Sequence, residues 1–158
     1  MKIYLDGVDG AGKSTLANYL SQYFKIDKFC LTKDSEKSID RYLEVRSIDN
    51  VVYDRTFLSE VVYPEIFNRK PWMSESDIKM LLDIYKKDIF IILTADIEDI
   101  RQRIFKRGDE FEEVIRQLEL INNSYLEIAK KYDLLLINTS ITSFKDVVDM
   151  IERRLHNG

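Results

Sequence analysis

The stretch GVDGAGKST, from Gly7 to Thr15, matches the pattern G-x-x-x-x-G-K-[ST] and decides the fold. It lies between a short apolar run, Ile3 to Leu5, and a segment from Leu16 to Phe24 whose apolar residues recur at helical spacing. A strand, a glycine-rich loop and a helix in this order form a phosphate-binding loop, in which backbone N–H groups and the helix N-terminus receive phosphate oxygens. The pattern therefore predicts a nucleotide-binding α/β protein.

Two side chains of this loop are suited to nucleotide chemistry. In loops of this pattern the lysine, here Lys13, reaches the β- and γ-phosphate oxygens, and the hydroxyl of Ser14 is a ligand for Mg²⁺. The alternative, a chance glycine turn before a helix, is disfavoured by the complete motif in its strand–loop–helix setting. GTPases, motor ATPases and small kinases share the loop, but no D-x-x-G or N-K-x-D segment follows a later strand. Guanine-nucleotide switches are therefore disfavoured.

Length and composition indicate one globular domain that acts on small molecules. The 158 residues are 45% hydrophobic and 33% charged, so we expect a single domain over 1–158. A net charge of -4 without long Lys/Arg blocks favours a small-molecule substrate over nucleic acid. The single cysteine, Cys30, cannot form an internal disulfide, and no apolar run approaches the ~20 residues of a membrane span. We expect a soluble, cytoplasmic protein without a membrane partner.

Short strands alternate with helices along the rest of the chain. Strands are predicted at 28–32, 50–53, 89–93 and 134–137, and the last two are apolar throughout, which is typical of buried strands. Helices are predicted at 35–46, 57–67, 74–85, 96–107, 111–131 and 144–155. Pro71 is expected to stop the second of these, and Ser74 with Asp77 to form a capping box. Together with the first strand, this pattern predicts five parallel strands joined by right-handed crossovers.

Several segments resemble the thymidylate kinase and deoxynucleoside kinase group of P-loop phosphotransferases. The stretch from Asp6 to Thr15 is similar to the thymidylate kinase loop, which has an acidic residue where Asp9 stands. Asp54-Arg55-Thr56-Phe57-Leu58-Ser59 is similar to the D-R-[Y/H/S]-x-x-S segment of the group, and Tyr63 matches the tyrosine that follows it. The resemblance covers nearly the whole chain. It implies the three-layer P-loop NTPase fold, with helices on both faces of the sheet and a helical lid at about 98–113.

The resemblance also implies roles at the acceptor side. Asp9 would approach the acceptor sugar, with a solvated loop carboxylate as the alternative. At the carboxyl end of a parallel strand, Asp54 is placed to help hold hydrated Mg²⁺ and Arg55 to bind a phosphate through a bidentate fork. The alternative for this pair is a helix cap with a surface salt bridge. The expected metal residues are Ser14 and Asp54, and the expected acceptor-binding residues are Asp9, Lys33, Asp34, Arg55, Ser59 and Tyr63.

Arg103 and Arg107 match the lid arginines of the same group. Four residues apart on a helix, they share one face, from which both would reach the transferring phosphoryl group; a solvated cationic face is the alternative. Ala11 stands where some thymidylate kinases have a basic residue, which fits a lid that supplies the cations. The expected catalytic residues are Lys13, Arg55, Arg103 and Arg107. The resemblance also implies that a turn at Asn138 and Thr139 wraps the donor adenine. With the residues of the phosphate loop, the expected donor-binding residues are then Gly7, Asp9, Gly10, Ala11, Gly12, Lys13, Ser14, Thr15, Asn138 and Thr139.

The resemblance implies transfer of the γ-phosphoryl group of ATP, with Mg²⁺, to a deoxynucleoside monophosphate. Among these acceptors it favours one similar to dTMP. The chain departs from the pattern on the acceptor side, where Pro64 replaces a glutamine and Thr56 a tyrosine, histidine or serine. Two alternatives remain open: a nucleoside kinase with Asp34 as general base, and a non-enzymatic nucleotide-dependent switch. Relatives commonly pair through helices beside the sheet, so the apolar stripe at 57–67 suits either a core or a homodimer interface.

Overall fold

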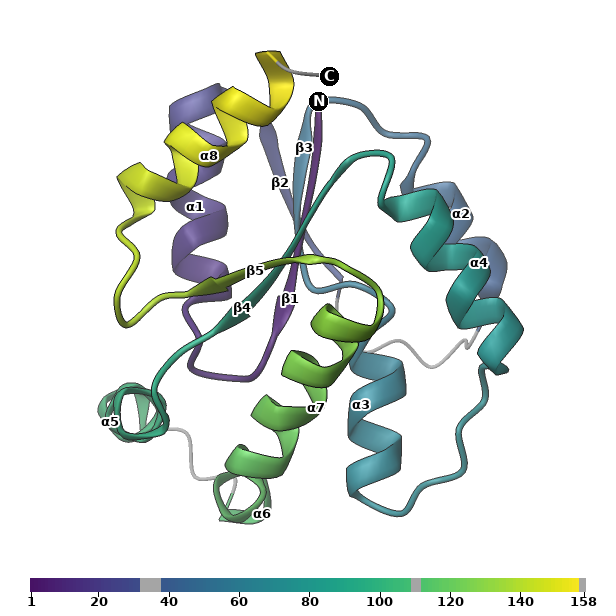
Figure 1. Cartoon of the computed structure of the whole chain (residues 1–158), viewed down its shortest axis with the longest axis vertical. Helices are drawn as coiled ribbons and strands as arrows, with labels where there is room; N and C mark the ends of the chain where they lie inside the picture. The colour runs from purple at the N-terminus through teal and green to yellow at the C-terminus, as the bar shows by residue number, and fades with distance from the viewer. Residues whose placement is uncertain (32–37, 109–111, 157–158) are drawn as a thin grey trace.

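Five parallel strands form one sheet in a computed structural model that describes residues 1–31, 38–108 and 112–156 (Figure 1). The strands are β1 (Lys2–Gly7), β2 (Asp27–Cys30), β3 (Val51–Asp54), β4 (Ile89–Thr94) and β5 (Leu135–Asn138), in the order β2-β3-β1-β4-β5. β1 lies in the middle and pairs with β3 and β4. All carboxyl ends therefore point to one edge of the sheet, where the segments that follow the strands meet. The predicted five-stranded parallel α/β fold is confirmed.

The two apolar strands of the carboxyl-terminal half differ in burial. Every residue of β4 is buried, as its uninterrupted apolar sequence predicts. The same prediction is wrong for β5, in which Ile137 is buried but Leu136 is 41% exposed. β5 stands at one end of the strand order and, among the described residues, pairs only with β4, so one of its sides has no neighbouring strand there. The apolar sequence of β5 does not indicate whether the strand lies in the middle or at the end of the sheet.

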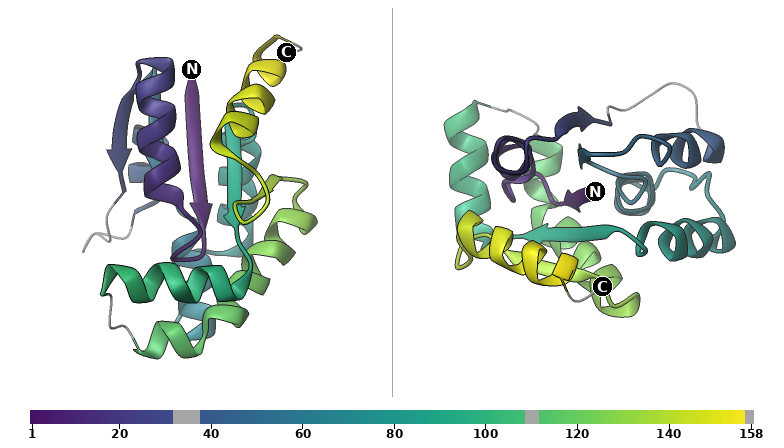
Figure 2. Two further views of the ribbon diagram at one scale, coloured as in Figure 1. Left: turned by 90° about the vertical axis from the view of Figure 1, so that its left-hand side faces the viewer. Right: turned by 90° about the horizontal axis from the view of Figure 1, so that it is seen from above.

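Helices cover both faces of the sheet, as predicted (Figures 1 and 2). α1 (Lys13–Phe24) and α8 (Phe144–His156) pack together on one face. The other face carries α3 (Ser59–Ile66) against α7 (Leu118–Lys131), and α2 (Ile39–Val45) against α4 (Glu75–Tyr85). α5 (Ile97–Arg107) and the short α6 (Glu112–Arg116) lie beyond the carboxyl ends of the strands (Figure 2). Within the described ranges, no helix is long and apolar enough to cross a bilayer.

Two predictions about how the helices end or continue differ from the structure. α3 ends at Ile66, well before Pro71, and Asn68 then takes a left-handed backbone conformation (φ 50°) that ends a helix without proline. The single helix predicted at 111–131 is two helices, α6 and α7. Between them the N–H of Gln117 donates to Val114 O, three residues back, which interrupts the α-helical pattern. The predicted capping box of Ser74 and Asp77 at the start of α4 is confirmed.

Gly7 determines how the loop leaves the sheet. It pairs with Leu93 of β4, and its φ is 139°. A Cβ atom on Gly7 would lie 2.0 Å from the carbonyl oxygen of Leu93, which is backbone and cannot rotate away. Glycine at this position therefore allows β1 to stay paired with β4 up to the first residue of the loop.

Gly7→Ala is expected to lower the free energy of unfolding by about 3 kcal/mol or more, because a backbone clash adds to the strain of a positive φ. Gly108→Ala is the matched control. Its φ is 73°, but apart from its chain neighbours no atom of the described residues lies within 4 Å of the added Cβ, so we expect only the strain of about 1–2 kcal/mol. Urea denaturation measures both losses. Equal losses in the two variants would contradict the importance of the contact with Leu93.

Candidate functional site

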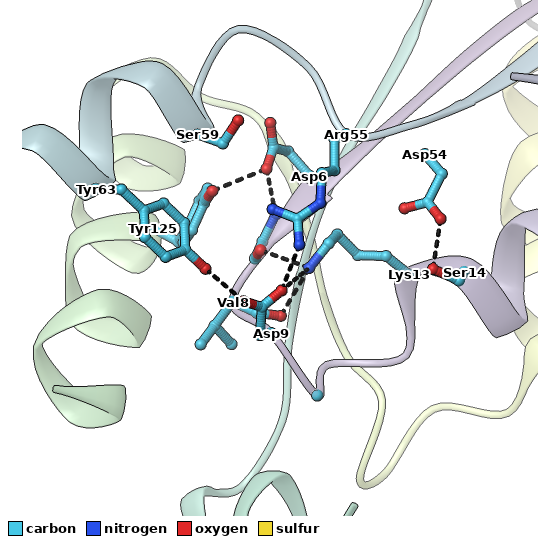
Figure 3. Close-up of polar contacts among 12 residues, drawn as sticks. Asp6, Val8, Asp9, Lys13, Ser14, Asp54, Arg55, Ser59, Tyr63 and Tyr125 are labelled. Atoms are coloured by element: carbon cyan, nitrogen blue, oxygen red, sulfur yellow. Dashed lines mark hydrogen bonds and ion pairs between the residues drawn. The ribbon is translucent and has the colours of Figure 1, made fainter. Parts of the chain in front are cut away.

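The loop between β1 and α1 curls around the ammonium group of Lys13 (Figure 3). Lys13 Nζ donates to the carbonyl oxygens of Gly7 (2.8 Å) and Val8 (2.9 Å). α1 begins at Lys13 after Gly12, which has a φ of 91° and no side chain to cap the helix, so the first backbone N–H groups of α1 face the loop. Burial lowers the pKa of Lys13, and the carboxylates of Asp9 and Asp6 oppose that shift. The loop therefore has the donors of an anion-binding site.

One carboxylate, that of Asp9, joins Lys13 to Arg55 (Figure 3). Asp9 Oδ1 lies 2.6 Å from Arg55 Nη2 and 3.7 Å from Lys13 Nζ. The hydroxyl of Tyr63, on α3, donates to Asp9 Oδ2 at 3.1 Å. Burial raises the pKa of Asp9, but the charges of Lys13 and Arg55 and the hydrogen bond from Tyr63 outweigh burial and hold this pKa below its ordinary value. At neutral pH Asp9 is thus an anion between two cations.

Arg55 reaches Asp9 from an unusual backbone conformation. Its φ is 81°, which costs about 1–2 kcal/mol for a residue with a Cβ atom. The backbone N–H of Arg55 donates to Leu5 O of β1 at 2.9 Å, so the strained residue is anchored to the central strand. Strain of this kind persists where the surrounding structure imposes it, and it is concentrated at functional sites.

Ser14 and Asp54 form a second polar pair at the start of α1 and the end of β3. The hydroxyl of Ser14 donates to Asp54 Oδ2. The other oxygen of Asp54, Oδ1, is buried and accepts no hydrogen bond from the described part of the chain. Such an oxygen is costly unless something else satisfies it, and a hydroxyl with a carboxylate is a donor set that Mg²⁺ accepts. The described residues contain no cluster of three His, Cys, Asp or Glu that could bind a metal alone.

A buried network beneath the loop was missed by the analysis of the sequence. Asp6 is fully buried and accepts hydrogen bonds from Gly7 N (2.8 Å), Thr56 N (3.0 Å), Thr56 Oγ1 (2.5 Å) and the hydroxyl of Tyr125 on α7 (2.8 Å). Burial raises the pKa of Asp6, while the hydrogen bond from Thr56 and the charge of Lys13 oppose that rise. The available signal was an acidic residue directly after the apolar run of β1, since a buried carboxyl group needs several donors.

α5 contacts the loop through Arg103. Its guanidinium donates from Nη1 to Gly10 O (3.1 Å) and to Thr139 Oγ1 (2.9 Å), and the Thr139 hydroxyl donates to Ala11 O (2.8 Å). Arg103 and Thr139 thus lie together beside the loop. Arg107, one turn further along α5, is close enough to Asp9 for its charge to contribute to the lowered pKa of that carboxylate.

Two further residues predicted for the site, Ser59 and Asn138, form hydrogen bonds within the protein, and two others are not described. Ser59 Oγ donates to Thr56 O in its own turn at 3.1 Å. The amide group of Asn138 donates to Asp96 Oδ1 at 3.1 Å, and Asn138 Oδ1 accepts from the N–H of Ser140 at 2.9 Å. Lys33 and Asp34 lie outside the described residues.

Known proteins with similar sequences identify the family. Residues 23–156 match the model of the family described as deoxynucleoside kinase. The uncharacterized SPbeta prophage-derived protein YorR of Bacillus subtilis is 32% identical over 133 residues, which cover 80% of each chain. The chain belongs to the deoxynucleoside kinase family. The family match begins after the phosphate loop, so the loop and the match are separate indications of a P-loop kinase.

Further members and neighbours resemble the chain over nearly its full length. A probable thymidylate kinase of Saccharolobus solfataricus is 25% identical and covers 97% of this chain and 94% of its own. The crystal structure of YorR in complex with phosphorylated GDP superimposes with a TM-score of 0.81 at 27% identity, over 99% and 98% of the two chains. The thymidylate kinase of Candida albicans shares the fold, with a TM-score of 0.66 at 18% identity over 99% and 91%. The predicted thymidylate kinase-like family and its fold are confirmed.

Tyr125→Phe tests whether the Asp6 network stabilises the site. The change removes one donor to a fully buried carboxyl group, so we expect a loss of about 1–3 kcal/mol in the free energy of unfolding. Tyr23→Phe is the matched control, because it removes the hydrogen bond from an exposed hydroxyl to Glu152 (3.1 Å) and is expected to cost within about 0.5 kcal/mol. A Tyr125→Phe protein as stable as the control in urea would contradict the role of the network.

Proposed function

We propose that this kinase transfers the γ-phosphoryl group of ATP to a deoxynucleoside monophosphate. The observation that carries the proposal is that Lys13 and Arg55, from two separate elements, approach the same oxygen of the Asp9 carboxylate. Lys13 belongs to the loop that would bind the donor phosphates. Arg55 comes from a separate element, the end of β3, and a guanidinium there suits a phosphate on the acceptor. A nucleoside would offer no phosphate to this second cation.

Transfer between two phosphate groups depends on positioning and charge neutralisation. The acceptor phosphate is already ionised near neutral pH, so no strong base is needed to activate it. Lys13 and Arg55 would hold the two substrates by their phosphates and offset negative charge as the phosphoryl group moves. Arg103 and Arg107 would extend this positive environment from α5. The hydrogen bond from Arg103 to Gly10 O and the contribution of the Arg107 charge to the lowered pKa of Asp9 support that role.

Mg²⁺ belongs to the proposal because the pair at Ser14 and Asp54 fits it. Ser14 would offer its hydroxyl, and the buried Oδ1 of Asp54 would accept from a water molecule of the hydrated ion. A bound Mg²⁺ supplies neutralisation of the charge on the donor phosphates. The residues of the chain orient that charge and bind the acceptor beside it.

Relatives support dTMP as the first acceptor to test, since several are named probable thymidylate kinases. The second candidate is phosphorylation of a nucleoside 5′-hydroxyl, which the description of the matching family favours. That reaction needs a general base, for which Asp34 remains the residue proposed from the sequence. The kinase relatives favour either enzyme over a nucleotide-dependent switch.

ADP release from Mg·ATP, measured with deoxynucleoside monophosphates and their parent nucleosides, tests the proposed reaction. We expect turnover with one or more monophosphates and a loss of about 10²–10³-fold or more in Lys13→Ala, because that variant lacks the cation of the loop. Lys28→Ala is the control: Lys28 Nζ binds the exposed side chain of Asn18 at 2.7 Å, away from the loop. Turnover with nucleosides alone would move the assignment to nucleoside kinase. The absence of turnover with both monophosphates and nucleosides would contradict the assignment as a nucleotide kinase.

Asp54→Asn tests the proposed metal residues separately from the reaction. The variant keeps the shape of the side chain but loses its charge, so Mg²⁺ should no longer tighten ATP binding. We expect the ratio of the ATP affinities with and without Mg²⁺, the Mg²⁺ effect, to fall by about 10–100-fold. Affinity for ATP in EDTA should change little. Titration calorimetry with and without Mg²⁺ measures both, with Asp49→Asn, an exposed carboxylate paired with Lys2 at 3.1 Å, as the control. An unchanged Mg²⁺ effect in Asp54→Asn would rule this residue out.

A further inference from the structure

Asp9 acts in this structure as the counter-anion of both cations of the site. A single atom, Oδ1, contacts Arg55 at 2.6 Å and lies within ion-pair distance of Lys13 at 3.7 Å. Lys13 is only 6% exposed, and Arg55 and Asp9 are 34% and 27% exposed. Without Asp9, the two neighbouring cations would lose the carboxylate that they share, and only the carboxylates of Asp6 and Asp54 would be left to offset the charge of the buried Lys13, which is unfavourable. The carboxylate therefore stabilises the arrangement of the two cations.

The contacts of Asp9 differ in the atoms that they use. Both cations lie on Oδ1, whereas the hydroxyl of Tyr63 donates to Oδ2 at 3.1 Å. A ligand that takes Oδ1's place on Arg55 would therefore leave the hydrogen bond from Tyr63 intact. The partial exposure of Asp9 and Arg55 leaves this pair within reach of a ligand, unlike the fully buried Asp6.

Only an anion offers Arg55 what Asp9 offers it. A phosphate group carries at least the charge of a carboxylate and can accept two hydrogen bonds from a guanidinium group, where Asp9 accepts one from Arg55. A neutral hydroxyl would leave Arg55 without a counter-charge, and the exchange would lose a charge-assisted hydrogen bond in a partly buried site. The cost of displacing Asp9 thus depends on the charge of the incoming group.

We propose that Asp9 is a resident anion that the phosphate of the acceptor must displace from Arg55, so that a phosphorylated acceptor, unlike a nucleoside, releases Asp9 Oδ1 from that cation. The inference rests on the proposed function and deepens it, since it names the group that holds Arg55 before the acceptor phosphate binds there. Displaced from Arg55, Oδ1 becomes available to a neutral hydroxyl group of the acceptor, with Tyr63 holding the other oxygen. Asp9 competes with every phosphate that binds Arg55.

Binding of inorganic phosphate tests the competition, because phosphate has no sugar for Asp9 to contact. Asp9→Asn removes the competing charge, so we expect it to bind phosphate at least tenfold more tightly than the wild-type chain in titration calorimetry. The gain should disappear in the double variant Asp9→Asn/Arg55→Gln. Glu60→Gln is the matched control: it removes one negative charge from α3, where Glu60 accepts from Trp72 Nε1 at 3.2 Å, and should change phosphate affinity less than twofold.

Tyr63→Phe provides a second test should Asp9→Asn fail to fold. Loss of its hydroxyl weakens the hold on Asp9, and we expect a smaller gain in phosphate affinity, two- to fivefold. The proposal is overturned by an unchanged or weaker affinity in the folded Asp9→Asn variant, by a gain that survives Arg55→Gln, or by an equal gain in Glu60→Gln. Turnover of monophosphates without any gain would overturn this inference alone, whereas a gain without turnover of any monophosphate would contradict only the proposed function.

Discussion

Four hydrogen-bond donors converge on the buried carboxyl group of Asp6, and the rest of the site depends on where they hold the chain. Two of the donors belong to Thr56, the residue after Arg55, and one to Gly7, which begins the loop that carries Lys13. The fourth comes from Tyr125 on α7. The end of β3, the start of the loop and a helix of one face are thus positioned relative to a single residue of the central strand.

Around the phosphate loop, next to this network, the side chains of positive and negative charge lie beside one another. Lys13 and Arg55 share the carboxylate of Asp9, and Asp54 lies beside Ser14 on the other side of the loop. Cations this close would repel one another, and their desolvation would be costly without the carboxylates. The same arrangement prepares the site for polyanionic ligands, because donors and positive charges are already oriented before a phosphate arrives.

The sequence was informative where chemistry depends on a local motif and silent where it depends on distant partners. The loop pattern and the Asp54-Arg55 segment predicted residues that the structure brings together at the carboxyl edge of the sheet. Tyr125 contacts Asp6 across 119 positions of the chain, a separation at which periodicity carries no information. The edge position of β5 and the interruption at Gln117 were missed for a related reason: strand order and local hydrogen-bond geometry are decided by packing.

Arg55 and Asp9 differ in how firmly the chain holds them. Arg55 has a strained backbone that is anchored by its N–H to Leu5 and by its neighbour Thr56 to Asp6, so a rotation of this residue would break several hydrogen bonds together. Asp9 lies in the loop and is held on the acceptor side by side-chain contacts alone, those from Arg55 and Tyr63. The backbone of Arg55 is therefore fixed before an anion arrives, and we expect the side chain of Asp9 to move aside while the guanidinium receives the phosphate.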